Sequence, residues 1–263
     1  MKLTGVLGFP VGHSRSPAMM NAAFDALGLD WRYLRLPVSP ERFEETVRAL
    51  PGSGYVGANV TIPHKLAAAG LADHLSESAA AIGAANTLSF GDAGIEADNT
   101  DAGGFLDALG EPPKGRALVL GAGGAARAVV WALREAGASE VSVWNRTPER
   151  ARKLAEELGA RHVASPEPAN IVVNATSVGL EPGTPAEEAL AALSLDEAEP
   201  PPTLVDLVYG DQPTVLCLWA RAGGSRVVDG LDVLVRQGAR SLRLWSGVEP
   251  PLELMRKAAA PAV

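Results

Sequence analysis

One segment constrains the fold of this chain more than any other, RALVLGAGGAARAVVWALREAG at residues 116–137. Its first part is a compact apolar run typical of a strand, and its second part has helical spacing and ends at a glycine. Between the two, GAGGAA fits the template G-x-G-x-x-G/A through Gly121, Gly123 and Ala126. The segment therefore predicts a strand, a tight turn and a helix, the unit from which parallel α/β sheets are built.

The three small residues of this turn also predict a ligand. The first allows the tight bend, the second lets backbone approach a pyrophosphate, and the third lets helix and strand pack closely. The N-terminus of the helix then offers free N–H groups and a positive dipole end to phosphate. We expect a dinucleotide here; the alternative is a tight turn with a purely structural role.

The next strand, residues 140–145, indicates which dinucleotide binds. A site for NAD usually has an acidic residue at the end of that strand, where it holds the ribose 2′-hydroxyl. This chain has Asn145, Arg146 and Thr147 there, and Arg150 one turn later. An arginine can bind a 2′-phosphate through two parallel hydrogen bonds, whereas an acid would repel it. We therefore predict NADP(H) as the cofactor; the alternative is that Arg146 is a solvated residue at a helix start.

Short β-type runs alternate with helical patterns along the whole chain, which is typical of α/β domains. The expected strands are residues 3–8, 31–36, 57–62, 86–90, 94–99, 116–121, 140–145, 169–176 and 203–209. The expected helices are residues 17–27, 40–50, a short one from 64, 122–137, 147–159, 230–247 and 248–260. The acidic, Pro-rich segment 181–202 is expected to be a surface excursion.

A Pro- and Gly-rich break at residues 111–115 separates two series of these elements. We predict an N-terminal three-layer α/β domain with a mostly parallel sheet, formed by residues 1–101 with 238–263. We predict a Rossmann-type NADP-binding domain formed by residues 102–237. The first domain is expected to bind a substrate, because residues just past the carboxyl ends of parallel strands converge on one crevice.

Composition argues against several other classes of protein. A net charge of −8 argues against a nucleic-acid-binding protein, which should carry a basic face. No apolar run is long enough to span a membrane, and the first residues contain no signal-peptide core. The single cysteine, Cys217, fits a reducing cytoplasm and is expected to be a buried structural thiol. His, Cys and acidic residues show no metal-ligand spacing, so we predict a cytoplasmic protein without a metal.

Small hydroxyl, amide and ionisable residues gather at element ends in three stretches, residues 8–17, 59–65 and 84–105. The residues expected to face one crevice are Ser14, Ser16, Asn59, Thr61, Lys65, Asn86 and Asp101. Such a set suits a small ligand with several hydroxyls and a carboxylate, since each buried ligand oxygen needs a partner. Taken singly, Lys65 could be a solvated surface residue, and Asp101 could be the N-cap of the following helix.

The sequence at this point resembles the shikimate dehydrogenases. The resemblance rests on motifs spread over nearly the whole chain in the order of that family: H-S-x-S-P, N-V-T-x-P-x-K, A-A-N-T, N-T-D-x-x-G-F, GAGGAA, N-R-T, N-A-T-S-x-G and Q-x-A. Enzymes of that family reduce 3-dehydroshikimate to shikimate with NADPH, reversibly and without a metal. One small departure is Met20-Asn21, where the family often has His-Asn.

The resemblance implies roles for the matching residues. Lys65 and Asp101 would be the catalytic pair. The residues that would bind substrate are Ser14 and Ser16, on the carboxylate, with Asn59, Thr61, Asn86 and Gln237. The residues that would hold the cofactor are Gly121, Ala122, Gly123, Gly124, Ala125, Ala126, Asn145, Arg146, Thr147, Arg150, Thr176, Ser177 and Val178, with backbone near Leu207 and Gly230.

The chemistry of ketone reduction agrees with this assignment. Hydride delivery leaves negative charge on the carbonyl oxygen, and a positioned ammonium supplies both charge and proton. A carboxylate beside the ammonium orients it and favours its charged form. Two alternatives stay open: a quinate/shikimate dehydrogenase with relaxed cofactor use, and a non-catalytic NADP-binding sensor. The protein is expected to be a monomer or homodimer, with no nucleic-acid or membrane partner.

Overall fold

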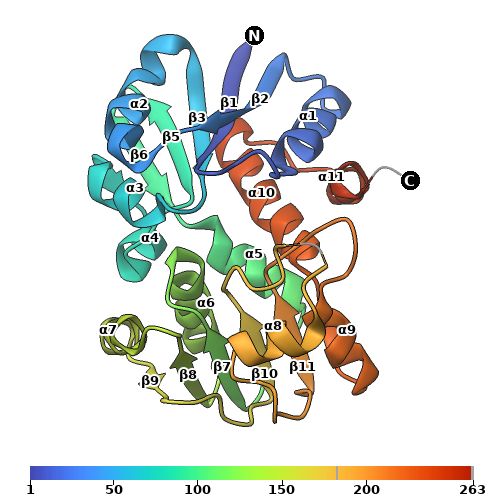
Figure 1. The fold of residues 1–263 in the computed structure, drawn as a ribbon. Coiled ribbons are helices and arrows are strands. Elements are labelled where there is room, and N and C mark those ends of the chain that lie inside the picture. The colour runs from blue at the N-terminus through green and yellow to red at the C-terminus, as the bar shows by residue number, and fades with distance from the viewer. Residues whose placement is uncertain (182, 262–263) are drawn as a thin grey trace. The chain divides into compact units, whose positions relative to one another are not determined.

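The computed structural model describes residues 1–181 and 183–261 and divides into two compact units (Figure 1). The first unit comprises Met1–Gly104 and Leu234–Ala260, and the second consists mainly of Phe105–Val233. Each unit has its own sheet of six strands. Residues 262–263, which the sequence assigned to the first domain, lie outside the described residues.

The sheet of the first unit has the order β2-β1-β3-β5-β6-β4. Its strands are β1 (Lys2–Gly8), β2 (Trp31–Pro37), β3 (Tyr55–Val60), β4 (His74–Leu75), β5 (Thr87–Gly91) and β6 (Gly94–Asp98). β1 is parallel to β2 and β3, and β4 is parallel to β6. Only β5 is antiparallel to its neighbours, so the prediction of a mostly parallel sheet is confirmed.

Helices cover both faces of this sheet. They are α1 (Ser16–Ala26), α2 (Phe43–Ala49), α3 (Lys65–Leu71), α4 (Glu77–Ile82), α10 (Gly230–Ser246) and α11 (Leu252–Ala259), with the start of α5 (Thr100–Leu109) and two short 3₁₀ turns at Pro40–Arg42 and Pro51–Ser53. Phe43, Val47 and Ala68 of α2 and α3 pack on the strand residues Leu7 and Val60. Burial of these apolar side chains is the main stabilising contribution to the layer.

Two glycines let helices of the first unit approach closely. A Cβ at Gly104 of α5 would lie 2.6 Å from the backbone nitrogen of Gln237 in α10, so only glycine fits at this crossing. A Cβ at Gly238 would lie 2.3 Å from the methyl carbon of Met19 in α1. The glycine of N-T-D-x-x-G-F therefore fixes how α5 and α10 cross, and Gly238 is a packing position for α1.

The sheet of the second unit is parallel throughout and has the order β12-β11-β10-β7-β8-β9. Its strands are β7 (Arg116–Leu120), β8 (Glu140–Trp144), β9 (Arg161–His162), β10 (Ile171–Asn174), β11 (Thr203–Asp206) and β12 (Arg226–Val228). Numbered from β7, this is the 3-2-1-4-5-6 order of dinucleotide-binding sheets. The predicted Rossmann-type fold is confirmed.

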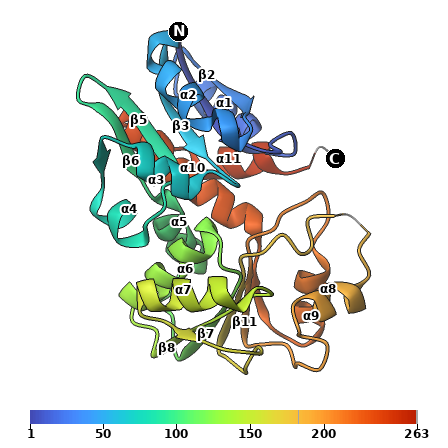
Figure 2. The same ribbon diagram turned by 60° about the vertical axis from the view of Figure 1, so that its left-hand side comes forward.

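Helices also lie on both faces of the second sheet. Figure 2 shows α6 (Gly124–Glu135) and α7 (Pro148–Leu158) on one side, with α8 (Ala186–Ala192) and α9 (Val215–Ala222) on the other. Leu118, Leu120 and Leu204 of the strands pack with Leu193 and Leu216 in a shared core. No helix of the described residues is long and apolar enough to cross a membrane.

Several elements differ from the sequence-based expectation. The segment 181–202 contains α8, and Leu193 and Leu195 just after it are buried, so part of this excursion belongs to the core. The helix α9 was not expected, nor were α4 and the short strands β4, β9 and β12. These are short elements whose position depends on contacts with the rest of the sheet.

Candidate functional site

The catalytic lysine expected from the sequence lies where a strand of the first unit turns into a helix. β3 ends at Val60, and the turn that follows is closed by a hydrogen bond from His64 N–H to the carbonyl of Thr61, 2.9 Å long. Thr61 N–H donates to the carbonyl of Leu7, 2.8 Å away, which joins this turn to the end of β1. Lys65 is then the first residue of α3.

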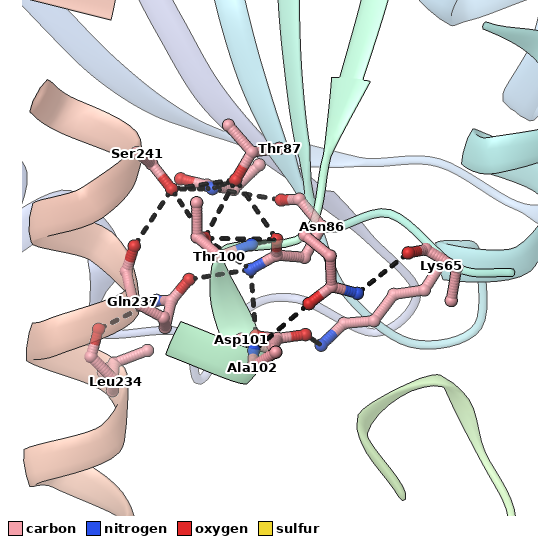
Figure 3. A network of polar contacts seen from close by, with 12 residues as sticks. Lys65, Asn86, Thr87, Thr100, Asp101, Ala102, Leu234, Gln237 and Ser241 are labelled. Carbon is pink, nitrogen blue, oxygen red and sulfur yellow. Dashed lines mark hydrogen bonds and ion pairs between the residues drawn. The ribbon is translucent and has the colours of Figure 1, made fainter. Parts of the chain in front are cut away.

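Lys65 and Asp101 form an ion pair (Figure 3). Lys65 Nζ lies 2.6 Å from Asp101 Oδ2, and the two side chains are only 12% and 17% exposed. Asp101 is the second residue of α5 and is not its N-cap, because the side chain of Asn99 accepts the hydrogen bond from Ala102 N–H at 3.2 Å. Since water is largely excluded, the attraction between the two charges is stronger than at an exposed surface.

Asn86 holds the other oxygen of Asp101. Its Nδ2 lies 2.9 Å from Asp101 Oδ1, 3.0 Å from Gln237 Oε1 and 2.9 Å from Thr100 Oγ1, so its two hydrogens are shared among three acceptors. Its Oδ1 accepts from Thr100 N–H at 2.7 Å. A backbone N–H can only donate, so this bond fixes which end of the amide faces Asp101. Asn86, Asp101 and Gln237, all expected at the site, are therefore brought together.

A layer of buried hydroxyls lies behind Asn86 and was not expected from the sequence. Thr87, Thr100 and Ser241 are 0%, 4% and 0% exposed, and their hydroxyl oxygens lie within 2.9–3.1 Å of one another. Ser241 Oγ also donates to the carbonyl of Gln237 at 3.1 Å, one turn earlier in α10. This layer joins α10 to β5 and α5, and Figure 3 shows it directly beside Asn86.

The side chain of Asn59 also forms hydrogen bonds with this layer of hydroxyls. Its Nδ2 donates to Ser241 Oγ at 2.8 Å and to the carbonyl of Asn86 at 3.0 Å, and its Oδ1 accepts from Tyr33 OH at 2.8 Å. Tyr33 is held in turn by Asn21, whose side chain pairs with both backbone groups of Tyr33 at 2.9 and 3.0 Å. The amide of Asn59 thus has protein partners at both ends, and its expected contact with a ligand stays a prediction.

The remaining substrate candidates lie in the loop after β1. Ser14 and Ser16 are both buried, and Ser14 Oγ accepts a hydrogen bond from Ser16 N–H at 3.3 Å. The carbonyl of Ser14 accepts two hydrogen bonds from Arg35, from Nε at 3.2 Å and Nη2 at 2.7 Å. Ser16 is the first residue of α1, and Arg15 occupies the N-cap position. The loop is therefore fixed by Arg35 on β2 and by the start of α1.

The two histidines that flank these stretches differ in their surroundings. His64 is 2% exposed, its Nε2 lies 2.7 Å from the carbonyl of Val38, and its ring stacks on Phe43 with centroids 4.3 Å apart. His13 is exposed. The contacts of His64 are those of a packing residue that orients the turn before Lys65.

In the second unit, the Gly-rich turn follows β7 as expected. Gly121 has a φ of +115°, a conformation that favours glycine, and a Cβ there would lie 2.8 Å from the carbonyl oxygen of Ala175. A Cβ at Gly123 would meet no atom within 4 Å, so the backbone here is open to an approaching group. α6 begins at Gly124, and Ala126 is fully buried against the sheet. Each small residue thus has the surroundings that a pyrophosphate-binding turn requires.

The end of β8 presents the basic residues expected to select the nucleotide. Asn145 Nδ2 donates to the carbonyl of Thr147 at 3.0 Å, which holds the turn before α7. Arg146, Thr147 and Arg150 are exposed. Among the described residues, no acidic side chain forms an ion pair with the guanidinium of Arg146 or Arg150. Both arginines are therefore free to meet an anion from solution.

The turn after β10 contains the other cofactor candidates. Thr176 Oγ1 donates to Asn174 Oδ1 at 2.7 Å and accepts from Val178 N–H at 3.0 Å, while Ser177 is exposed. Just past the end of the neighbouring strand β11, Leu207 N–H donates to the carbonyl of Asn174 at 3.0 Å. Gly230 lies against Leu207, because a Cβ at Gly230 would be 2.6 Å from the Leu207 carbonyl oxygen. The candidates at 176–178, 207 and 230 thus belong to adjoining strand ends.

The described residues include no group of three His, Cys, Asp or Glu side chains able to hold a metal ion. The free Cys217 is 1% exposed, and burial, with a smaller contribution from the charge of Asp206, raises its pKa to about 11. It is therefore a protonated thiol at neutral pH, in agreement with a structural residue.

Comparison with known proteins identifies the family. The family model for the shikimate dehydrogenase substrate binding domain matches residues 6–88, that for shikimate / quinate 5-dehydrogenase matches residues 107–178, and that for the shikimate 5′-dehydrogenase C-terminal domain matches residues 230–260. The shikimate dehydrogenase (NADP(+)) of Methanothermobacter thermautotrophicus is 41% identical over 271 residues, which cover 97% of this chain and 95% of the relative.

Comparison with solved structures identifies the same family. Shikimate 5-dehydrogenase from Thermus thermophilus, in complex with NADP(H) and shikimate, is 44% identical and superposes with a TM-score of 0.85 over 98% of both chains. Shikimate dehydrogenase from Aquifex aeolicus is 36% identical and superposes with a TM-score of 0.90, covering 99% of this chain and 98% of that one.

Proposed function

This chain belongs to the shikimate dehydrogenase family, and we propose that it catalyses the reversible, NADPH-dependent reduction of 3-dehydroshikimate to shikimate. The observation that carries the proposal is the water-shielded pair of Lys65 and Asp101, 2.6 Å apart. A sensor that only binds ligands has no need of a proton-transfer pair, so this pair favours an enzyme.

Lys65 is the proton donor in this proposal. Bound NADPH supplies the hydride, and negative charge then develops on the carbonyl oxygen of the substrate. The ammonium of Lys65 stabilises that charge and donates a proton to the oxygen, which becomes the new hydroxyl of shikimate. In the reverse direction the neutral amine takes the proton back. Lys65 suits the role because it begins α3 and is held in a fixed direction by Asp101.

Asp101 keeps the ammonium of Lys65 oriented through their ion pair. Its two oxygens have separate partners, Lys65 on Oδ2 and Asn86 on Oδ1, so the carboxylate cannot rotate without breaking a bond. Asn86 and Gln237 lie next to this carboxylate and are proposed to contact the hydroxyls of the substrate. Preorganisation of this kind lowers the barrier, because no reorientation is required during the reaction.

The substrate carboxylate is proposed to bind at Ser14 and Ser16, with Thr61 and Asn59 as the further polar contacts. Both serines are buried, and Arg35 fixes the backbone at Ser14 by two hydrogen bonds to its carbonyl, while Ser16 begins α1. A buried carboxylate needs such donors, since each unpaired oxygen would cost about 1–3 kcal/mol. Residues 1–101 with 238–263 form the substrate-binding domain in this proposal.

The cofactor is proposed to bind to residues 102–237. Gly123, where the backbone is open, and the N–H groups at the start of α6 would hold the pyrophosphate. Arg146 and Arg150 bind the 2′-phosphate, with Asn145 and Thr147 shaping the turn that presents them. One such charge-assisted bond would favour NADP over NAD by about 10- to 150-fold.

Four reactions test the proposal, pairing shikimate or quinate with NADP or NAD and following the absorbance of the reduced nicotinamide. Fast reduction with shikimate and NADP alone is the expected result. Comparable rates with quinate or NAD would assign the protein to enzymes of relaxed specificity. Binding of NADP without any turnover would contradict the catalytic roles of Lys65 and Asp101 and leave a sensor as the explanation.

A further inference from the structure

A buried carboxylate in the second unit has no role in the proposed reaction. Asp206 is the last residue of β11 and is fully buried. No cation of the described residues pairs with it. Burial raises the pKa of its carboxyl, and hydrogen bonds from Thr214, Val208, Asn174 and Cys217 oppose that shift. A buried charge without a counter-ion is costly, and a chain keeps such a residue mainly where a site depends on it.

All four neighbours of Asp206 donate hydrogen bonds to it. Oδ1 accepts from Asn174 Nδ2 at 2.8 Å and from Val208 N–H at 3.1 Å. Oδ2 accepts from Thr214 Oγ1 at 2.5 Å and faces Cys217 Sγ at 3.9 Å. Thr214 Oγ1 already accepts from Cys217 N–H at 3.2 Å, so its proton points to Asp206. This arrangement requires an acceptor at both oxygens, which a carboxylate provides and an amide does not.

Asp206 orients the turn after β10 through Asn174. Asn174 Oδ1 accepts from Thr176 N–H at 3.1 Å, so its Nδ2 must point away from Thr176, toward Asp206. The same Nδ2 donates to the carbonyl of Val178 at 3.1 Å. The amide of Asn174 thus closes the turn 174–178 on itself, and Asp206 fixes the rotation of that amide. Just past the end of its own strand, Asp206 also accepts a hydrogen bond from Val208 N–H, next to the backbone at Leu207.

The strand order says which part of the cofactor meets these two strand ends. The pyrophosphate turn follows β7, and the adenine ribose lies toward β8. The order of strands reverses between β7 and β10, so the nicotinamide half extends over the carboxyl ends of β10 and β11. Asn174 and Asp206 are the last residues of those two strands.

We propose that Asp206 is a positioning residue for the nicotinamide half of the cofactor, which fixes the turn 174–178 and the backbone at 207–208 relative to each other. The inference rests on the proposed function, because it assumes that NADP(H) binds to this sheet. Asp206 does not touch the cofactor itself; it acts through Asn174 and Val208.

The test compares two ligands on the same variants by titration calorimetry. NADP has both halves, whereas adenosine 2′,5′-bisphosphate has the adenine half and the 2′-phosphate but no nicotinamide. Asp206→Asn places an NH₂ group against a donor and should weaken NADP binding by about 10- to 100-fold. It should leave the affinity for adenosine 2′,5′-bisphosphate within about twofold, because Arg146 and the Gly-rich turn are unchanged.

Two substitutions of Thr214 test the same role with a smaller change at Asp206, in case the Asp206→Asn variant does not fold. Thr214→Val keeps the shape but removes the donor to Asp206 Oδ2, and should weaken NADP by several-fold without affecting adenosine 2′,5′-bisphosphate. Thr214→Ser keeps the hydroxyl and should restore wild-type affinity for NADP.

Equal losses of affinity for both ligands, or unchanged NADP affinity in Asp206→Asn and Thr214→Val, would overturn the positioning role while leaving the proposed function intact. Failure of the wild-type protein to bind NADP at all would instead overturn the proposed function, and this inference with it.

Discussion

Replacing Arg146 tests how the protein distinguishes NADP from NAD. Arg146 is exposed, and its guanidinium forms no ion pair with the described residues, so its whole bonding capacity is available to a ligand. Each charge-assisted bond to a 2′-phosphate would contribute about 1.5–3 kcal/mol, so the loss of one bond corresponds to about 10- to 150-fold in affinity. Arg146→Ala should raise the KM for NADP by such a factor and leave the KM for NAD unchanged. Arg146→Asp should do more, because it adds repulsion.

The structure offers a matched control for the loss of one positive charge. Arg152 lies on α7, the helix that follows Arg146, and is exposed; its Nη1 lies 3.6 Å from Glu149 Oε1. Arg152→Ala should leave both KM values unchanged. The free energy of unfolding should change by less than about 0.5 kcal/mol in Arg146→Ala and in Arg152→Ala, because an exposed ion pair or an unpaired exposed residue contributes little to stability.

The assay measures initial rates against NADP and NAD at fixed shikimate, for the wild type and the three variants. A rise of the KM for NADP by the same factor as that for NAD would remove Arg146 from the phosphate site. If Arg152→Ala raised the KM for NADP as much as Arg146→Ala, the overall charge of this surface, and not a contact made by Arg146, would set the preference for NADP over NAD.

Three further predictions concern packing and reactivity. Ser241→Ala should lower stability to denaturant by about 1–2 kcal/mol, because the hydroxyl that accepts from Asn59 is lost; an unchanged midpoint would contradict the described layer. Gly121→Ala should destabilise the protein, since the new Cβ meets the Ala175 carbonyl, whereas Gly123→Ala should keep stability and weaken NADP binding; equal stability losses would be inconsistent with the open backbone at Gly123. Cys217, with its pKa raised to about 11, should react with iodoacetamide at about pH 8 only after unfolding, and fast alkylation of the native protein would refute its burial.

The parts of the fold that could be predicted are those with a local signal. The unit from Arg116 to Glu135 combines an apolar run, a small-residue turn and helical spacing, and it forms as expected. α9 was missed because Val215–Ala222 is short and apolar, a pattern that fits a strand as well as a helix. Its N-cap Thr214, whose side chain accepts from Cys217 N–H, was the available signal.

The sequence indicated the residues of the candidate site but not the hydrogen bonds that hold them in place. Lys65, Asn86, Asp101 and Gln237 belong to recognisable motifs, and the structure brings them together. Ser241 carries no motif, and only its spacing of four residues from Gln237 could have placed it on the same face of α10. Long-range contacts of this kind, such as Asn59 with Ser241, depend on how α10 packs on the sheet, which no local pattern specifies.

The N-cap of α5 also differs from the residue expected from the sequence. Asp101 was a reasonable N-cap candidate from the sequence, but Asn99 takes that role and leaves Asp101 free to pair with Lys65. The N-cap of α5 thus lies two residues before Asp101, a shift that is common at helix starts.

The most direct test of Lys65 as the proton donor is the turnover of Lys65→Met, measured together with its affinity for NADPH. Methionine keeps much of the length of the side chain but has neither charge nor proton to donate. We expect turnover to fall by about 10²- to 10⁴-fold while NADPH affinity stays within about twofold, because the residues proposed to bind the cofactor do not include Lys65. A turnover near that of the wild type, with shikimate and NADP, would show that Lys65 is not the proton donor.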